Sequence, residues 1–254
     1  PDSAKNIFEA IEMCYVVIQN LKKMLIKNGK TTNVGDEGGF APDLKTNEEA
    51  LNLITDAIEK SNFKPGIDIS ICLDVAANEL VDSKGKYKIK SDYYESPDEV
   101  INYYKKITLE YPIKSIEDPF AEEDWDSLRK LNKELGHKIQ IVGDDLFVTN
   151  FSRLKRGIES KSANSILVKP NQIGTLSETL NVISLAKKNN FNTIISHRSG
   201  DTEDTFIADL AVSTQSSQIK TGSLARSERV AKYNRLVRIE AVSYTHLTLP
   251  TIPG

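Results

Sequence analysis

The sequence predicts an α/β fold in which parallel strands form a TIM-like (β/α)8 barrel. First, six short runs of largely β-branched apolar residues have the composition of strands that are buried on both faces. They are Asp68–Asp74, Ile113–Asp118, Ile139–Asp145, Ser165–Lys169, Thr193–His197 and Gln218–Lys220. Second, helical patterns alternate with these runs, which indicates a parallel sheet. Third, each run ends in a carboxylate, a lysine or a histidine, as strands do at the mouth of a barrel enzyme.

The helical segments begin at recognisable signals. Over residues 7–25, apolar residues recur in alternating steps of four and three, which makes one continuous stripe on a helix. Thr46, Ser96 and Thr175 each stand three residues before a glutamate, the pattern of a capping box, and a proline follows the second of them. Further helices are predicted at 122–135, 150–161, 202–214 and 225–240.

An open, doubly wound sheet is the alternative to the barrel. Such sheets bind their ligands at one switch point, and those that bind dinucleotides carry a glycine-rich turn after the first strand. No strand of this chain is followed by that turn, and polar strand ends continue along the whole series. We therefore favour the barrel.

Composition narrows the class of protein. The 254 residues suffice for one barrel, and 39% hydrophobic with 27% charged residues is a soluble globular profile. A net charge of −3 gives no reason to expect a nucleic acid or a membrane surface as partner. No apolar run is long enough to span a bilayer, and no secretory signal opens the chain. Cys14 and Cys72 are predicted to be buried free thiols. We expect a cytoplasmic protein.

Three strand-end carboxylates, Asp74, Glu117 and Asp144, are the candidate metal ligands. They come from different strands, and a barrel mouth would bring them together. Three carboxylates stay ionised side by side only if a cation neutralises them. Oxygen ligands without a nearby cysteine point to a hard ion, Mg²⁺ before Mn²⁺ or Ca²⁺. The simpler interpretation is that each acid is a helix N-cap or a salt-bridge partner. The occurrence of such an acid at the ends of three successive strands counts against it.

Cationic and donor groups follow the later strands. Lys169 ends a buried strand, where a desolvated amine near a metal could act as a base, although an ion pair with a neighbouring carboxylate is the simpler role. His197, Arg198 and Ser199 offer donors at one turn, with Arg198 suited to bidentate binding of phosphate or carboxylate. Lys220 adds another positive charge. Together with a metal, they imply a small substrate that carries several negative charges.

The turn Gly35–Gly39 places Glu37 in a tight glycine-rich loop. Alone this is a weak signal, and the spacing differs from that of a phosphate-binding P-loop. Beside a metal and a lysine base, a positioned acid fits abstraction of a proton α to a carboxylate. That reaction needs metal charge to stabilise the dianionic intermediate.

Several stretches of the sequence resemble the enolase family. They are VGDEGGFAP, SIEDPFAEEDW, VGDDLFVTN, LVKPNQIGTLSET, SHRSGDTEDTFIADLAV and QIKTGSLARSERVAKYNRLVRIE. They run from about Asn33 to Glu240, in the family's order and spacing. The resemblance implies Mg²⁺-dependent, reversible dehydration of 2-phosphoglycerate to phosphoenolpyruvate, a lyase reaction of glycolysis.

The resemblance also implies roles for individual residues. Lys169 would remove the C2 proton, and Glu37 would assist departure of the C3 hydroxide as an acid. The ligands of Mg²⁺ would be Asp74, Glu117 and Asp144. The substrate-binding residues would be His197, Arg198, Ser199, Lys220, Glu117 and Asp144.

The chain also departs from the family's pattern. Enolases carry an N-terminal domain and opening strands ahead of the first helix seen here, so residues 1–241 are expected to form an incomplete barrel. Residues 242–254 carry no charge and match no family segment, so we expect an artefactual, disordered tail that does not continue the helix.

These departures bear on function. We expect a homodimer for the full-length protein and weak or no activity for this chain alone. Two other functions stay open. One is another lyase or racemase of the enolase superfamily that acts on a different carboxylate. The other is a non-catalytic protein-binding fragment.

Overall fold

Six parallel strands lie side by side in the order in which they occur along the chain. The computed structural model describes residues 1–89, 95–216 and 218–248. The strands are β1 (Ile71–Asp74), β2 (Ile113–Glu117), β3 (Gln140–Gly143), β4 (Ser165–Val168), β5 (Asn192–Ser196) and β6 (Gln218–Lys220). All six predicted strands are confirmed, most of them a residue or more shorter than predicted, and every neighbouring pair is parallel.

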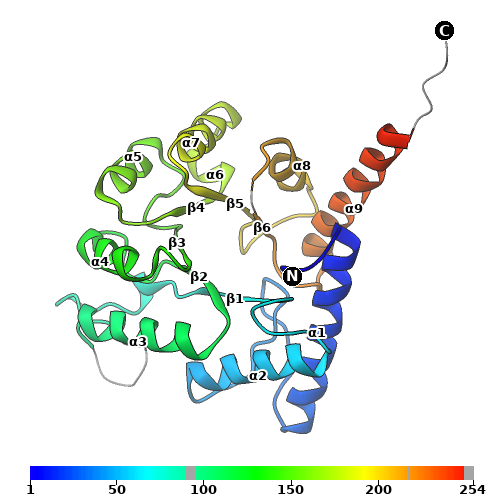
Figure 1. The fold of residues 1–254 in the computed structure, drawn as a ribbon, viewed down its shortest axis with the longest axis horizontal. Helices are drawn as coiled ribbons and strands as arrows, with labels where there is room; N and C mark the ends of the chain where they lie inside the picture. Colours follow the sequence, from blue (N-terminus) through cyan, green and yellow to red (C-terminus); the bar gives the residue numbers. More distant parts are fainter. Residues whose placement is uncertain (90–94, 217, 249–254) are drawn as a thin grey trace.

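Helices alternate with the strands and cover the outside of the sheet (Figure 1). They are α1 (Ile7–Lys27), α2 (Asn47–Lys60), α3 (Pro97–Glu110), α4 (Trp125–Leu135), α5 (Phe151–Ser160), α6 (Pro170–Ile173), α7 (Leu176–Lys188), α8 (Phe206–Ser213) and α9 (Ser227–Thr248), with a 3-10 turn at Ala77–Glu79. Helix α1 packs against both α2 and α9. The predicted caps at Thr46, Ser96 and Thr175 accept hydrogen bonds from the glutamate three residues on, and Ser96 forms the complete capping box.

The sheet curls but does not close. Within the described residues, β1 pairs only with β2 and β6 only with β5, so two strand edges remain free. Figure 1 shows the curled sheet surrounded by helices on its outer side. The fold is therefore an incomplete TIM-like barrel, as the sequence predicted.

Apolar residues fill the outer face of the sheet far more than the inner face. The main core lies between strands and helices and includes the fully buried Ile116 and Ile166. On the inner face a small separate cluster joins only Val142, Leu167 and Ile194. Because side chains alternate along a strand, the residues two positions after Val142 and Leu167 share this inner face. The next inner positions are Asp144 and Lys169.

The structure corrects two predictions. Helix α9 runs to Thr248 instead of ending at Glu240, so residues 242–248 continue the helix that they were expected to end. Loss of charge does not stop a helix, and the first strong breaker is Pro250; residues 249–254 lie outside the described part of the chain. Cys72 is exposed, not buried, because it shares the thinly filled inner face with Asp74 on the free edge strand β1.

Among the described residues, no helix combines the length and the apolar character that a bilayer span requires.

Candidate active site

The carboxyl ends of the six strands place the predicted side chains at one edge of the sheet. Asp74, Glu117 and Lys220 are the last residues of their strands, and Asp144, Lys169 and His197 come directly after theirs. A cavity of about 420 Å³ lies there. Its lining consists of Glu37, Asp74, Lys169, Asn171, Ser196, His197, Arg198, Ser199, Gly200 and Lys220. Seven of the nine predicted site residues thus line one cavity; Glu117 and Asp144 lie beside it, bonded to its two lysines.

Lys220 is shared by two carboxylates. Its Nζ donates to Asp74 Oδ2 at 2.7 Å and to both oxygens of Glu117 at 2.9 Å. The Glu117 side chain is only 7% exposed, whereas that of Asp74 is 46% exposed. Burial, with the charges of Asp74 and Asp144, raises the pKa of Glu117 to about 8 even though Lys220 opposes the rise. Burial is therefore the main reason that Glu117 holds its proton more tightly than an exposed carboxyl group does.

Lys220 itself keeps its proton. Burial lowers the pKa of its ammonium, but the charges of Glu117 and Asp74 raise it by more, and the net shift is upward. Lys220 thus pairs with neighbouring carboxylates in this structure, which is the simpler role expected for a charged group at a strand end.

Lys169 forms an ion pair with Asp144. Its Nζ contacts Asp144 Oδ2, and both side chains are largely buried, at 16% and 10% exposed. Gln172 Nε2 donates to the other oxygen of Asp144 at 3.3 Å. Lys169 is also the N-cap of the short α6, whose first residue is Pro170, and its backbone N–H donates to Thr149 Oγ1. The side chain is therefore anchored at its base and directed to the inner face.

The loop that carries Glu37 is held by the segment between β6 and α9. The Ser223 N–H donates to the Glu37 carbonyl at 2.8 Å, which attaches the loop at the glutamate itself. Gly38 has φ +80°, and a Cβ there would lie 2.5 Å from the Ala225 carbonyl oxygen, so only glycine fits. Gly38 thus allows the close backbone approach that fixes Glu37.

Glu37 faces the turn that follows β5. Ser199 Oγ donates to Glu37 Oε1 at 3.2 Å, and His197 Nε2 lies 3.4 Å from Glu37 Oε2. The neighbouring His197, more than the opposing effect of burial, lowers the pKa of Glu37 to about 2. The carboxylate is ionised at neutral pH in this arrangement. An acid role would require its pKa to rise when substrate binds.

Arg198 reaches across the cavity from the same turn. Its Nη1 donates to Asn171 Oδ1 at 3.0 Å, and the side chain is exposed. The guanidinium is therefore available to an anionic ligand, as predicted from its type.

Two buried cations of α9 were not foreseen from the sequence. Arg229 is fully buried at 0% exposed, and Lys232 at 1%. Lys232 Nζ donates to Asp201 Oδ1 at 3.0 Å, and the Arg229 guanidinium reaches the His197 ring. With Leu236 they form a buried stripe at positions i, i+3 and i+7, a spacing that could have revealed them if charged residues were not by default assigned to solvent.

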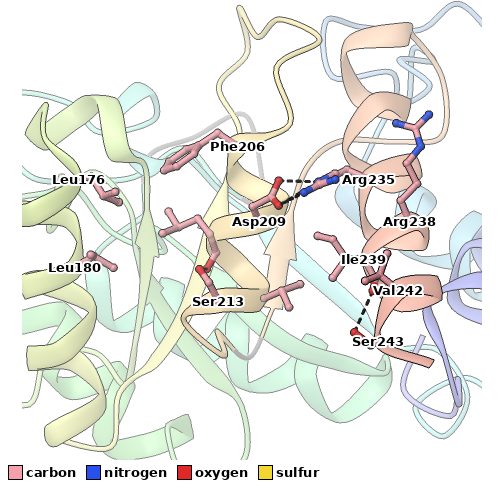
Figure 2. Close-up of a pocket in the computed structure, with 12 residues that line it drawn as sticks. Leu176, Leu180, Phe206, Asp209, Ser213, Arg235, Arg238, Ile239, Val242 and Ser243 are labelled. Carbon is pink, nitrogen blue, oxygen red and sulfur yellow. Dashed lines mark hydrogen bonds and ion pairs between the residues drawn. The ribbon is translucent and has the colours of Figure 1, made fainter. Parts of the chain in front are cut away.

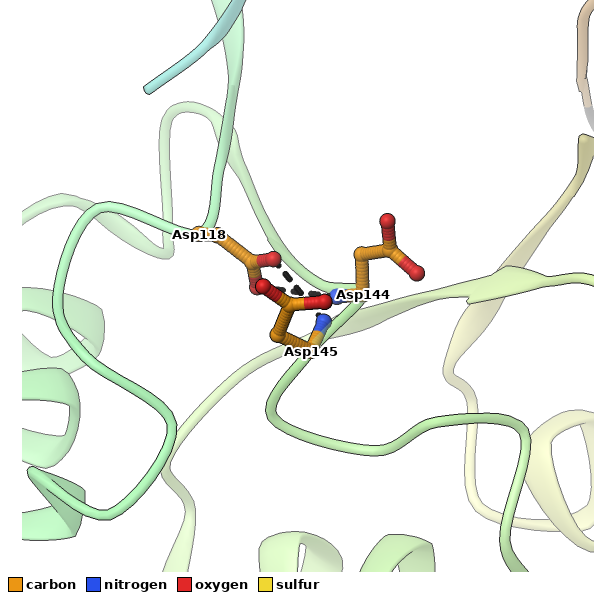
Figure 3. Close-up of side chains that lie close together, drawn as sticks. All are labelled: Asp118, Asp144 and Asp145. Atoms are coloured by element: carbon orange, nitrogen blue, oxygen red, sulfur yellow. Dashed lines mark hydrogen bonds between the residues drawn. The ribbon is translucent and has the colours of Figure 1, made fainter. Parts of the chain in front are cut away.

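A second group of acids lies close together in the described part of the chain. Ligand oxygens of Asp118, Asp144 and Asp145 fall within 4.8 Å of one another (Figure 3). Asp118, however, accepts the backbone N–H groups of Asp144 and Asp145 at 2.9 and 2.8 Å. Burial raises the pKa of Asp118 to about 7. Its oxygens already have partners, so this cluster is explained by the turn after β3 without an ion.

The predicted ligands Asp74, Glu117 and Asp144 suit a divalent cation by their chemistry. All are carboxylates on successive strands. Burial is the main cause of the raised pKa of Glu117, and the charges of Asp74 and Asp144 add to it. A hard cation bound by the three groups would favour their ionised forms.

A larger hollow on the outside of the molecule lacks such chemistry. It measures about 500 Å³ and lies between α7, α8 and α9 (Figure 2). Leu176, Leu180 and Phe206 give it an apolar lining, and the carboxylate of Asp209 is paired with Arg235 at 2.5 Å. We therefore place the functional site at the strand ends.

The chain is similar in sequence to known proteins. Residues 1–245 match a family model described as "Enolase, C-terminal TIM barrel domain". The chain is also similar to the enolase of Pelagibacter ubique (strain HTCC1062), with 64% identity over 240 residues. The similar region covers 94% of this chain and 57% of that relative, so the chain spans little more than half of the relative's length.

Proposed function

Because the chain belongs to the family of enolase C-terminal TIM barrel domains, we propose that its cavity takes part in the enolase reaction. The reaction is the reversible dehydration of 2-phosphoglycerate to phosphoenolpyruvate, with Mg²⁺ as the metal. The observation that carries the proposal is the position of Lys169. It stands at the end of β4, next to a metal-type carboxylate, and lines the same cavity as Glu37 and Arg198.

Lys169 is the proposed base. Proton abstraction from C2 requires an uncharged amine at Nζ. This atom contacts Asp144 Oδ2, and both side chains are largely buried, so the proposed base and a proposed metal ligand interact directly.

The carboxylates hold the cation in this proposal. A bound Mg²⁺ would supply positive charge where the substrate carboxylate gains negative charge. Asp74, Glu117 and Asp144 are its proposed ligands, and Lys220 keeps Asp74 and Glu117 in place while donating to both. Lys220 is itself proposed to bind substrate oxygens.

The opposite wall binds the rest of the substrate. His197, Arg198 and Ser199 lie at one turn and line the cavity, so they can donate to phosphate or carboxylate oxygens. Glu37 completes the wall, and its transfer of a proton to the departing hydroxide requires its pKa to rise from about 2. Since the relative is much longer than this chain, we expect weak overall turnover from the chain alone.

Exchange of the C2 hydrogen tests the base separately from the complete reaction. In D₂O with Mg²⁺, the chain should replace the C2 proton of 2-phosphoglycerate by deuterium, which proton NMR follows as loss of the C2–H signal. Exchange needs only Lys169 and the cation site, so weak dehydration does not mask it.

Matched variants sharpen this experiment. Lys169→Ala should abolish the exchange, whereas Lys138→Ala, an exposed lysine at the opposite end of the sheet, should keep it. Exchange that persists in Lys169→Ala would assign the base elsewhere. Absence of both exchange and Mg²⁺-dependent binding of 2-phosphoglycerate by the folded chain would contradict the proposed function. Equal exchange with carboxylates that lack phosphate would favour another superfamily reaction.

A further inference from the structure

Arg229 lies behind the cavity, in the first turn of α9, and connects two loops of the site. Its Nη1 donates to the Arg198 carbonyl at 2.7 Å and lies 2.7 Å from His197 Nδ1. Its Nη2 donates to the carbonyls of Asp36 at 3.0 Å and Ser199 at 2.6 Å. One guanidinium thus joins the turn after β5 to the loop that carries Glu37.

The contact with the imidazole fixes where its proton lies. A guanidinium has only donors, so His197 Nδ1 must present its lone pair to Arg229. A protonated ring would set two N–H groups and two positive charges against each other in a buried place, since His197 is 2% exposed. The proton of the neutral ring is then on Nε2.

We infer that Arg229 holds His197 in the neutral tautomer that carries its proton on Nε2, which makes His197 a hydrogen-bond donor to an anionic oxygen in the cavity and not a proton acceptor. The tautomer follows from the contacts of Arg229 alone. Its meaning for catalysis rests on the proposed function, because there the oxygen belongs to the substrate. Arg229 is accordingly a positioning residue.

The other ring nitrogen, Nε2, is the one that would donate to an anionic oxygen in the cavity. Within the described residues, His197 Nε2 is buried and has no hydrogen-bond partner. Glu37 Oε2 lies 3.4 Å away, near enough to interact electrostatically but not aligned for a hydrogen bond. Charged groups near the ring include Glu37 from its loop, Arg198 from the same turn, Lys220 from β6 and Arg229 from α9. A phosphate or carboxylate oxygen is the ligand that Nε2–H would accommodate beside these donors.

Hydrogen bonds to carbonyl oxygens and close packing orient the guanidinium. Asp201 Oδ2 lies 4.0 Å from Arg229 Nη1, farther away than the three carbonyl oxygens. A Cβ on Gly222 would lie 2.7 Å from both Arg229 Cδ and the Glu37 carbonyl oxygen. The missing side chain at Gly222 therefore leaves the space through which Arg229 reaches both loops.

Nitrogen-15 NMR of histidine-labelled chain tests the inference without substrate or Mg²⁺. The labelled chain carries the two substitutions His137→Gln and His246→Gln, so that His197 is its one remaining histidine. At neutral pH we expect one neutral form, with a pyridine-type Nδ1 signal and a pyrrole-type Nε2 signal. A proton on Nδ1, or a doubly protonated ring, would overturn the inference. Since no turnover is measured, failure of the proposed function would not affect the result.

Two substitutions on the same helix test the role of Arg229. In Arg229→Met, the ring loses its fixed donor, and its signals should move toward an average of the two tautomers. Arg235→Met removes a partly exposed arginine that pairs with Asp209, and it should leave the His197 signals unchanged. An unchanged single tautomer in folded Arg229→Met would overturn the assignment to Arg229. If Arg229→Met does not fold, the spectrum of the His137→Gln, His246→Gln chain, which keeps Arg229, still shows which tautomer His197 adopts.

Discussion

The two sides of the cavity are built from different interactions. On the carboxylate side, defined by Asp74, Glu117 and Asp144, two lysines contact three acidic side chains. On the guanidinium side, defined by Glu37, His197 and Arg229, the buried arginine donates to three backbone carbonyls and one ring nitrogen.

This difference predicts different behaviour. The carboxylate side carries groups whose charge depends on pH and on bound cations, and its ammonium partners can exchange for a metal ion. Backbone carbonyls have no titratable proton, so the contacts of Arg229 with them on the guanidinium side should persist when the charge balance changes. The first side is thus adjustable and the second is preformed, as a site that binds an anionic substrate around a cation requires.

Replacing Lys220 by Met should have the largest effect on folding above about pH 8, where Glu117 is ionised and would be left buried without its cation. Removing one partner of a buried ion pair costs about 3 kcal/mol at the lower end of the usual range, which suits a lysine whose side chain is 28% exposed. Denaturant unfolding measures the loss. Adding Glu117→Gln to Lys220→Met should recover much of it, since a neutral amide needs no cation.

Lys130→Met is the control for that substitution. Lys130 pairs with Asp98 at 3.2 Å, but both side chains are more than half exposed, at 61% and 74%. The expected loss is below about 1 kcal/mol. Equal losses for Lys220→Met and Lys130→Met would show that the ion pairs of the carboxylate side do not stabilise the fold.

Replacing Gly222 by Ala tests the packing of the guanidinium side. Gly222 has φ +84°, and its added Cβ would meet Arg229 and the Glu37 carbonyl. Gly85→Ala is matched in conformation, at φ +71°, but has open space around the Cβ. We expect a loss of about 1 kcal/mol for Gly85→Ala and about 3 kcal/mol for Gly222→Ala, from backbone strain alone and from strain with overpacking. Equal losses in denaturant unfolding would contradict the tight fit.

The fold was predictable because its signals are local and repeated. Apolar runs ended by polar residues located every strand, and cap residues located several helix starts to the residue, as at Ser96. The end of α9 was not predictable from the loss of charge, because a helix ends where backbone chemistry stops it and Pro250 comes later. Cys72 was misplaced because burial at a sheet edge depends on which neighbour is present.

The site was only half predictable for a related reason. Strand ends bring Asp74, Glu117 and Lys220 together by topology alone, so type and spacing suffice. Arg229 donates to backbone carbonyl oxygens, and because every residue has one, the amino-acid sequence does not indicate which of them it contacts. The low pKa of Glu37 likewise follows from contacts with His197 and Ser199, which lie more than 150 residues away in the chain.

The pH dependence of stability should distinguish the two sides further. Burial raises the pKa of Glu117 to about 8 in the folded chain, against about 4.3 when unfolded. Between these values the unfolded chain has lost a proton that the folded chain retains. Stability therefore falls as pH rises, by at most about 1.4 kcal/mol per pH unit, and this slope ends above about pH 8. Denaturant unfolding with a chelator present measures it.

Glu117→Gln should remove this slope, so the difference between the native chain and the variant isolates Glu117 from all other titrating groups. A difference that stays constant between pH 5 and pH 8, a range that lies inside the window of about 4 to 8, would show that Glu117 does not titrate there.

Mg²⁺ should stabilise the carboxylate side by a smaller amount. A ligand at ten times its dissociation constant adds about 1.4 kcal/mol to the free energy of unfolding. Asp74→Asn should abolish this gain if Asp74, Glu117 and Asp144 hold the ion. Asp145→Asn should abolish it instead if the close cluster of Asp118, Asp144 and Asp145 does. The variants Asp74→Asn and Asp145→Asn thus distinguish two candidate sets of metal ligands. One set consists of residues at the ends of successive strands, and the other of aspartates whose oxygens lie close together. A gain that survives both substitutions would place the cation outside either set, and the carboxylate side would then be a structural ion-pair group.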